Sequence, residues 1–151
     1  MAHWQRPSLR CSKMRHVRVE REDTPVMFVG AEADPQIVSG VAQRAFSELE
    51  SRLGTLRGRR FFGVFKPASS EYLASVQTKD GDDADALGLQ QTVIPGGAYL
   101  RATITGQPPA VYAQIGPAFE ELEKQQPPDV TRPLIEFYRR HNEIDLLVPV
   151  A

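Results

Sequence analysis

The chain has 151 residues, of which 41% are hydrophobic and 25% are charged, a composition typical of a soluble globular protein. This length predicts one domain, or two small halves that share a core. Because 18 Lys and Arg residues are balanced by 19 Asp and Glu residues, the net charge is −1, and we expect no direct binding to nucleic acid, which usually needs a far more basic chain.

Cysteine usage and hydropathy predict the compartment. A single cysteine, Cys11, cannot form an internal disulfide and is typical of a reducing cytosol. No apolar run approaches the roughly 20 residues of a membrane span, and the N-terminus lacks the apolar core of a signal peptide. We therefore expect a cytoplasmic protein without membrane contact. Residues 1–15 are basic and unpatterned, which predicts a flexible tail before a single domain over residues 16–151.

The first half of the chain predicts two strands, a helix and two more strands. Strand-like patterning covers residues 17–19 and 26–33. Asp34 and Pro35 then have the residue types of a helix N-cap and first helical position, and Gly54 is a natural stop. Two further strands are expected over residues 61–66 and 72–78.

The second half begins after a loop, residues 80–85, that contains four aspartates. Its spacing does not match a calcium-binding loop, so we expect a solvated loop and no metal. Strands are predicted over residues 87–94 and 98–105, around a Pro-Gly-Gly turn. A second helical stretch follows residues 108–109, and Gly116-Pro117 must kink or restart it.

The C-terminal segment reads as a hairpin with one unusual residue. Its strands are residues 134–138 and 144–150, joined by a polar turn over residues 139–143. Glu136 lies between Ile135 and Phe137, and side chains alternate across a strand. If Ile135 and Phe137 face the core, Glu136 and Tyr138 share the opposite face. That face is either solvated or the floor of a pocket.

An internal repeat favours the pocket. The order strand, turn, strand, helix, strand, strand occurs twice, over residues 16–80 and 87–151. Aligning the strands after the two helices places Phe65 opposite Tyr138 and Gly63 opposite Glu136. Neither half has enough surface for its own core, so we expect the halves to pack about a pseudo-twofold axis with a ligand cleft between them.

Four segments in this order resemble the GyrI-like (gyrase-inhibitor-like) small-molecule-binding domain, also called the AraC-type or bacterial transcription activator effector-binding domain. They are Thr92-Val-Ile-Pro-Gly-Gly-Ala-Tyr99, Phe62-Gly-Val-Phe65, Arg132-Pro-Leu-Ile-Glu-Phe-Tyr138 and Ile144-Asp-Leu-Leu-Val-Pro149. The resemblance implies an α+β fold of duplicated βαββ modules, an antiparallel sheet with helices on one face, and an aromatic cleft with a buried acid at its base. Glu136 matches that acid.

The resemblance also implies the function. Members fused to DNA-binding domains sense lipophilic, often cationic drugs, and stand-alone members bind small molecules. We therefore expect a multidrug-type binding protein, acting as a sensor or by sequestering its ligand, with no cofactor. The expected ligand-binding residues are Glu136 as charge anchor, Tyr138 and Phe65 as stacking walls, Tyr112 and Phe119 on the helix side, and Gly63, Phe61 and Tyr99. For each aromatic residue, plain core packing is the competing interpretation.

Two other functions use the same chain differently. Some members hydrolyse strained cyclopropane-containing toxins, which here would use Glu136 as general acid or base with the hydroxyl of Tyr138 or Tyr99. A third interpretation is a regulator that binds a protein partner such as DNA gyrase, with transcription regulation in doubt because no DNA-binding domain accompanies the chain. The expected oligomeric state is a monomer or weak homodimer, and the natural ligand stays open.

Overall fold

The computed structural model describes residues 14–32 and 38–151. Residues 1–13 of the tail predicted over residues 1–15, and the proposed cap residues Asp34 and Pro35, lie outside this range. The elements in chain order are β1 (Val17–Arg21), β2 (Thr24–Glu32), α2 (Val38–Arg52), β3 (Phe61–Lys66), β4 (Glu71–Gln77), α3 (Ala84–Leu87), β5 (Gln90–Ile94), β6 (Gly97–Thr105), the 3₁₀ helix η2 (Ala110–Gln114), α4 (Ile115–Gln125), β7 (Leu134–Arg140) and β8 (Glu143–Pro149).

Eight strands form one antiparallel sheet in the order β1-β6-β8-β7-β3-β4-β2-β5. Replacing β1–β4 by β5–β8, and the reverse, gives the same order read backwards, so the sheet has a pseudo-twofold axis between β3 and β7. Each half places its first strand on the far edge, β1 beside β6 and β5 beside β2. The duplicated α+β fold expected from the repeat is therefore confirmed, and neither half is a separate unit.

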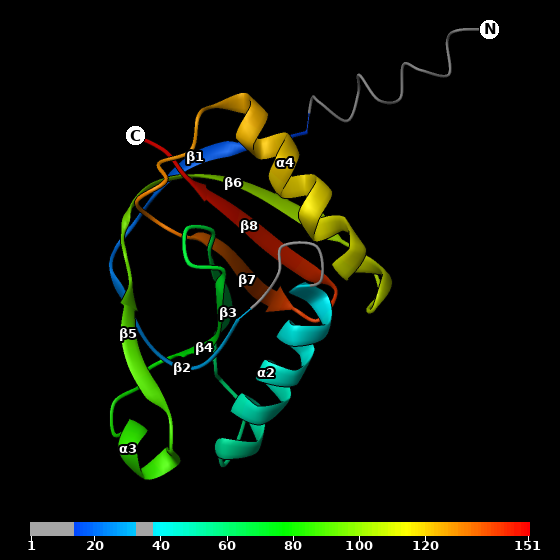
Figure 1. Ribbon diagram of the computed structural model, residues 1–151. Helices are drawn as coiled ribbons and strands as arrows, with labels where there is room; N and C mark the ends of the chain where they lie inside the picture. The colour runs from blue at the N-terminus through cyan, green and yellow to red at the C-terminus, as the bar shows by residue number, and fades with distance from the viewer. Residues whose placement is uncertain (1–13, 33–37) are drawn as a thin grey trace, which may run out of the picture.

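The two long helices cover the same face of the sheet, α2 over β2 and β4 and α4 over β6 and β8 (Figure 1). We call this the helix face. Leu49 and Leu53 of α2 pack on it beside Met27, and Phe119 and Leu122 of α4 pack on it beside other strand residues. The cleft between the helices lies above the central strands β3 and β7.

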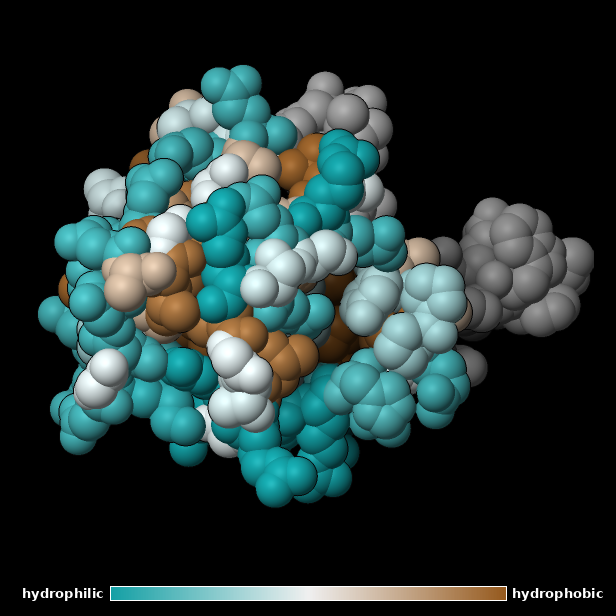
Figure 2. All heavy atoms as spheres, turned by 90° about the horizontal axis from the view of Figure 1, so that it is seen from below, coloured by the Kyte–Doolittle hydropathy of each residue, from teal (hydrophilic) through white to brown (hydrophobic). Residues whose placement is uncertain are grey.

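The other face of the sheet has its own core without a covering helix. We call it the inner face; Phe62, Val64, Tyr99, Ile135 and Leu147 are almost fully buried there. Such burial requires the sheet to curl upon itself, and the ribbon shows β1, β2 and β5 bending away from the helices around this core (Figure 1). Ile135 is thus a core residue, as its alternation predicted. The face of the molecule seen in Figure 2 is largely hydrophilic, with some hydrophobic patches.

A six-residue motif marks the duplication in the helices. Residues 45–50 of α2 read Ala-Phe-Ser-Glu-Leu-Glu, and residues 118–123 of α4 read Ala-Phe-Glu-Glu-Leu-Glu. The Ala and Leu of both copies are buried against the sheet. A 73-residue shift (118 minus 45) relates these copies, and the same shift relates Gly63 to Glu136. The axis therefore relates equivalent helices and equivalent strands to each other.

Three local expectations need correction. The C-terminal hairpin turns over His141 and Asn142 alone, so its strands extend further than predicted into residues 139–143. Residues 84–87 form a short helix, capped by the carboxylate of Asp83 and ended by Gly88 at φ 72°, so β5 begins only at Gln90. Asp82, assigned to a solvated loop, is mostly buried in an ion pair with Arg59.

The helical stretch around Gly116 and Pro117 consists of two successive helices and is not a single bent one. The 3₁₀ helix η2 ends at Gln114, and α4 starts at Ile115, so Pro117 falls in the first turn, where its missing N–H is tolerated. The restart turns Tyr112 of η2 and Phe119 of α4 toward the cleft, where both line the same cavity.

Candidate functional site

The register of the two central strands places Gly63 directly opposite Glu136. Phe61 pairs with Tyr138 and Phe65 with Leu134 in the same antiparallel ladder, on either side of that pair. The pseudo-twofold axis therefore passes between a glycine and a glutamate. Glu136 points to the helix face and is only 6% exposed, so the solvated interpretation of this residue does not hold.

Two tyrosine hydroxyls hold the carboxylate. Tyr138 donates a hydrogen bond to Oε1 of Glu136 at 2.6 Å, and Tyr72 donates to the same oxygen at 2.9 Å. Among the described residues, no hydrogen bond reaches Oε2. One carboxylate oxygen is thus fixed in place by two donors, while the other accepts no hydrogen bond from the described residues.

Gly63 provides the space for this arrangement. A Cβ atom on residue 63 would collide with the hydroxyl of Tyr72 and with Oε1 of Glu136. The pseudo-equivalent of Tyr138 is Phe65, and the register makes Ile144 the pseudo-equivalent of Tyr72. The hydrogen-bonded cluster therefore has no symmetric counterpart, because apolar residues occupy the positions equivalent to its two tyrosines.

Burial dominates the electrostatics of the cluster. It raises the pKa of Glu136 above 4.5, although the hydrogen bonds from Tyr138 and Tyr72 act in the opposite direction. Burial and the nearby Glu136 carboxylate also raise the pKa values of Tyr72 and Tyr138 well above 10. The hydroxyls thus stay protonated and remain donors, and the carboxyl holds its proton to higher pH than an exposed glutamate does.

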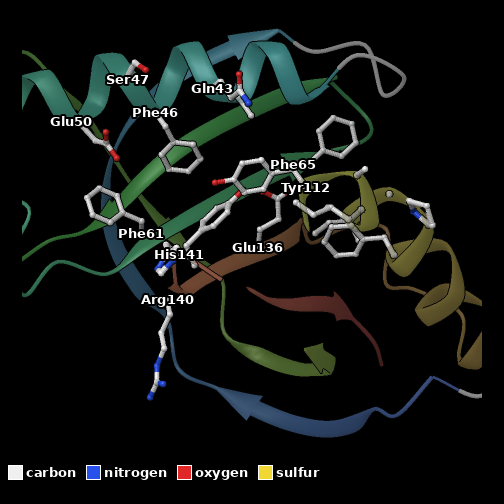
Figure 3. Close-up of a pocket in the computed structure, with 18 of the residues that line it drawn as sticks. Gln43, Phe46, Ser47, Glu50, Phe61, Phe65, Tyr112, Glu136, Arg140 and His141 are labelled. Carbon is white, nitrogen blue, oxygen red and sulfur yellow. The ribbon is translucent and has the colours of Figure 1, made fainter. Parts of the chain in front are cut away.

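The cluster forms the base of a cavity of about 890 Å³ between α2 and α4. Figure 3 shows the cavity with Phe46 reaching down from α2, Phe61 and Phe65 on the adjoining strand, and Glu136 below. Apolar or aromatic residues line most of it, namely Ala42, Phe46, Phe61, Phe65, Tyr112, Ala113, Ile115, Pro117, Phe119, Leu134 and Tyr138. The volume is of the size that proteins use for drug-sized ligands.

Phe46 is the centre of the aromatic wall. Its ring meets those of Tyr138, Tyr72 and Phe61 edge to face, with centroids 5.3, 6.2 and 6.4 Å apart. Such contacts hold the tyrosine rings that carry the donor hydroxyls. Phe119, the pseudo-equivalent of Phe46, lines the cavity from α4.

Few of the ionisable groups around the cavity are cationic. Its ionisable lining residues are Glu50, Glu120, Glu136, Arg140 and His141. Arg140 points away from the cavity in Figure 3 and lies 3.8 Å from Glu143. Within the described part of the chain, no cation therefore pairs with Glu136. No group of three or more His, Cys, Asp or Glu side chains is placed there to hold a metal ion.

Seven of the eight residues expected at the site come together here. Phe61, Phe65, Tyr112, Phe119, Glu136 and Tyr138 line the cavity, and Gly63 lies beneath the cluster. Tyr99 does not join them. It is fully buried on the inner face, donates to the carbonyl of Pro95 and packs under the guanidinium of Arg132, so it cannot reach Glu136.

Sequence reasoning missed two residues of the cluster. Phe46 was not among the expected site residues, but the repeated Ala-Phe-x-Glu-Leu-Glu motif pairs it with Phe119 and would have identified it. Tyr72 carried no such signal. Its hydroxyl reaches Glu136 only because β4 pairs with β3 in a register that brings Tyr72 beside Gly63.

Comparison with known proteins identifies the fold. No protein-family model and no curated protein matches the chain. Similar solved structures include an integron cassette protein from the mobile metagenome of Vibrio cholerae, with a TM-score of 0.68 and 12% identity over 90% of this chain and 95% of that one. SAV2435, solved bound to tetraphenylphosphonium, has a TM-score of 0.64 and 15% identity over 91% and 94%. A hydrolase from Listeria innocua has a TM-score of 0.56 and 12% identity over 91% and 92%.

At these identities the similarity shows the fold alone, and the shared fold agrees with the one that the GyrI-like resemblance implied. The match covers nine-tenths or more of each chain, so the shared region includes both halves of the duplication and the cleft between them. No helix among the described residues is long and apolar enough to cross a membrane.

Proposed function

We propose that the protein binds lipophilic cations of drug size in the cavity between α2 and α4, with Glu136 as the charge anchor. The observation that carries the proposal is a carboxylate that is 6% exposed, held by two tyrosine hydroxyls, at the base of an aromatic cavity of about 890 Å³.

The energetics of Glu136 favour a cation. A carboxylate that is buried without a positive partner is less stable than the same group in water, so it either takes a proton or binds a cation. The raised pKa of Glu136 reflects this cost. A lipophilic cation that enters the cavity supplies the missing charge next to Oε2. Removing this cation from water costs little free energy, because most of its surface is apolar.

The aromatic walls favour a broad range of shapes. Phe46, Phe119 and Tyr112 present ring faces or edges to the cavity, and each ring over which a cation lies contributes about 0.5–2 kcal/mol. Such contacts depend on the ligand having charge and apolar bulk more than on one shape. The site should therefore accept ligands of many shapes but require a positive charge. This is the behaviour of a multidrug-type sensor or sequestering protein.

The comparison supports the proposal without deciding it. SAV2435, which shares the fold, was solved bound to tetraphenylphosphonium, a lipophilic cation. At 15% identity, the shared ligand class is an inference for this chain, and the Glu136 cluster is the physical reason to make it.

A pair of ligands that differ in charge alone tests the proposal. Tetraphenylphosphonium and tetraphenylborate have nearly the same size and shape but opposite charge, and isothermal titration measures both. We expect the parent to bind the cation at micromolar levels and not the anion. Glu136→Gln should weaken cation binding at least tenfold, about 1.4 kcal/mol. Equal binding of both ions, or a Gln variant that binds the cation as tightly as the parent, contradicts the proposal.

A second candidate function is hydrolysis of a bound electrophile. The specific observation in its favour is a carboxyl group of raised pKa in hydrogen-bond contact with Tyr138, a pairing that suits general acid–base chemistry. A hydrolase also stands among the proteins of similar fold. Mass spectrometry of the ligand after incubation separates the two functions. Intact ligand supports the binder, and a product that Glu136→Gln no longer forms supports the hydrolase.

A further inference from the structure

The cavity between α2 and α4 opens beside two exposed carboxylates, one on each helix. Glu50 of α2 and Glu120 of α4 both line the cavity, and we call them the mouth carboxylates. They belong to the two copies of the repeated Ala-Phe-x-Glu-Leu-Glu motif, which gives each helix a run of acids beside its cavity-lining phenylalanine. In Figure 3, Glu50 extends from α2 on the same side as Phe46.

The mouth carboxylates differ from Glu48 and Glu121 on the same helices in having no salt-bridge partner. Glu48 pairs with Arg52 at 3.2 Å, and its equivalent Glu121 pairs with Lys124 at the same distance. Within the described part of the chain, neither Glu50 nor Glu120 takes part in a salt bridge. The charges on the helix flanks are thus neutralised locally, whereas those at the mouth are not.

The other charged groups around the mouth of the cavity do not make its electrostatic potential positive. Arg140 lies near Glu143 and points away from the cavity, which leaves His141 as the other basic group in the lining. Glu123 of α4, whose pKa is raised by burial and then by the charge of Glu120, does not line the cavity. Three carboxyl groups, two at the mouth and Glu136 at the base, therefore give the path into the cavity a negative potential.

We propose that Glu50 and Glu120 steer cations into the cavity and set the rate of ligand capture, while Glu136 sets how long the ligand stays. This inference rests on the proposed function and adds a kinetic division of labour to it. Exposed ion pairs contribute little affinity because water screens them. Exposed charges of one sign around an opening instead raise the association rate of an opposite charge, and that effect weakens as salt shortens the Debye length.

Stopped-flow fluorescence with a cationic rhodamine ethyl ester measures the two rate constants separately. Between ionic strengths of about 0.01 M and about 0.15 M, the Debye length falls from roughly 30 Å to roughly 8 Å. We expect the association rate constant of the parent to fall across this range. The double variant Glu50→Gln/Glu120→Gln should associate about 3- to 10-fold more slowly at the lower salt and lose most of the salt dependence, with the dissociation rate constant within about twofold of the parent's.

Two matched variants control for net charge and position. Glu22→Gln/Glu32→Gln removes two exposed carboxylates that do not line the cavity, and it should keep the association rate of the parent. Ser47, which lines the cavity, is the pseudo-equivalent of Glu120, so Ser47→Glu adds the missing acid to the α2 wall and should speed association at low salt.

Each outcome decides the inference. An association rate that the mouth variant leaves unchanged, or a loss of affinity that appears in the dissociation rate, overturns steering while leaving Glu136 as the anchor. A charge-matched control that slows association equally shows a net-charge effect and also overturns it. A parent that binds no cation overturns the proposed function and this inference together.

Discussion

Glycine at position 63 is as much a part of the site as the glutamate opposite it. The Tyr72 hydroxyl and the Glu136 carboxylate share the space that any other side chain at this position would need. The duplication brings these two positions together on the axis, and the divergence of one into Gly and the other into Glu makes room for a single acid. A symmetric pair of acids at this separation would repel each other.

The first prediction at the residue scale concerns Gly63→Ala. The new methyl group must displace the buried Tyr72 ring or the Glu136 carboxylate, and overpacking of this kind costs about 1–3 kcal/mol. We expect a lower urea midpoint and weaker cation binding. Gly54→Ala is the control, because no atom lies within 4 Å of the added methyl. Equal stability of the Gly63 variant and the parent would show that the cluster adapts freely.

The second prediction concerns pH. Burial raises the pKa of Glu136 in the folded protein above 4.5, so the folded state holds this proton more tightly than the unfolded chain does. The stability that the protonated group contributes is present below about 4.5 and is lost as the pH rises through the folded pKa. The free energy of unfolding of the parent, relative to Glu136→Gln, should therefore fall as the pH rises above about 4.5. Urea denaturation of both proteins measures this difference, and parallel pH profiles would contradict it.

At the scale of elements, the ion pair between Arg59 and Asp82 ties the connector before β3 to the loop before α3. The guanidinium donates to both carboxylate oxygens, at 2.7 and 2.9 Å, and both side chains are about 10% exposed. The hydrogen bonds from Arg59 lower the pKa of Asp82 to about 2. The loop over residues 80–85, which was expected to be solvated, is thus held in place by Arg59.

Breaking this pair should destabilise the protein in a pH-dependent way. Asp82→Asn leaves the largely buried Arg59 guanidinium without its charge partner, at a cost on the order of 1–2 kcal/mol. Because the pKa is lowered, the contribution is present above about 3.8 and is lost as the pH falls toward about 2. Thermal unfolding at neutral pH measures the loss. Glu71→Gln, which removes an exposed pair with Lys66 at 4.0 Å, should change stability by less than about 0.5 kcal/mol.

Sequence patterns predicted the elements better than their contacts. Helical spacing, prolines and glycines placed both long helices and most strands, because these signals act over a few residues. The pairing of Arg59 with Asp82 and of Tyr72 with Glu136 depends on strand register, which no local pattern carries. Tyr99 was expected at the site but does not lie there. Strand alternation places its side chain on the inner face of the sheet, away from the cluster.

At the scale of the whole molecule, one arginine closes the loop after α4 onto the neighbouring strands β6 and β8. Arg132, just before β7, donates to the carbonyls of Gly96, Ala98 and Val150, pairs with Asp129 and packs over Tyr99 with its guanidinium carbon 4.9 Å from the ring centroid. It thereby joins the start of β6, the end of β8 and the loop after α4. The sequence could not predict that each half places its first strand on the other half, β1 beside β6 and β5 beside β2. A sequence repeat does not show which half of the sheet each strand joins.

Arg132→Lys tests this closure. A lysine keeps the charge but cannot form the fork of hydrogen bonds, so we expect the free energy of unfolding to fall by about 1–3 kcal/mol. Arg101→Lys on β6 is the control, since Arg101 has no salt bridge within the described part of the chain. A loss of the same size in both variants would mean that closure does not depend on Arg132.

A crystal structure with tetraphenylarsonium bound tests the central claim most directly. This cation has the shape of tetraphenylphosphonium, and its arsenic atom locates the charge by anomalous scattering. We predict one arsenic peak in the cavity between α2 and α4, next to Oε2 of Glu136, with phenyl groups against Phe46 and Phe119. A peak on the inner face or outside the cavity, with Glu136 still held by its two tyrosines alone, would contradict the assignment of Glu136 as the anchor.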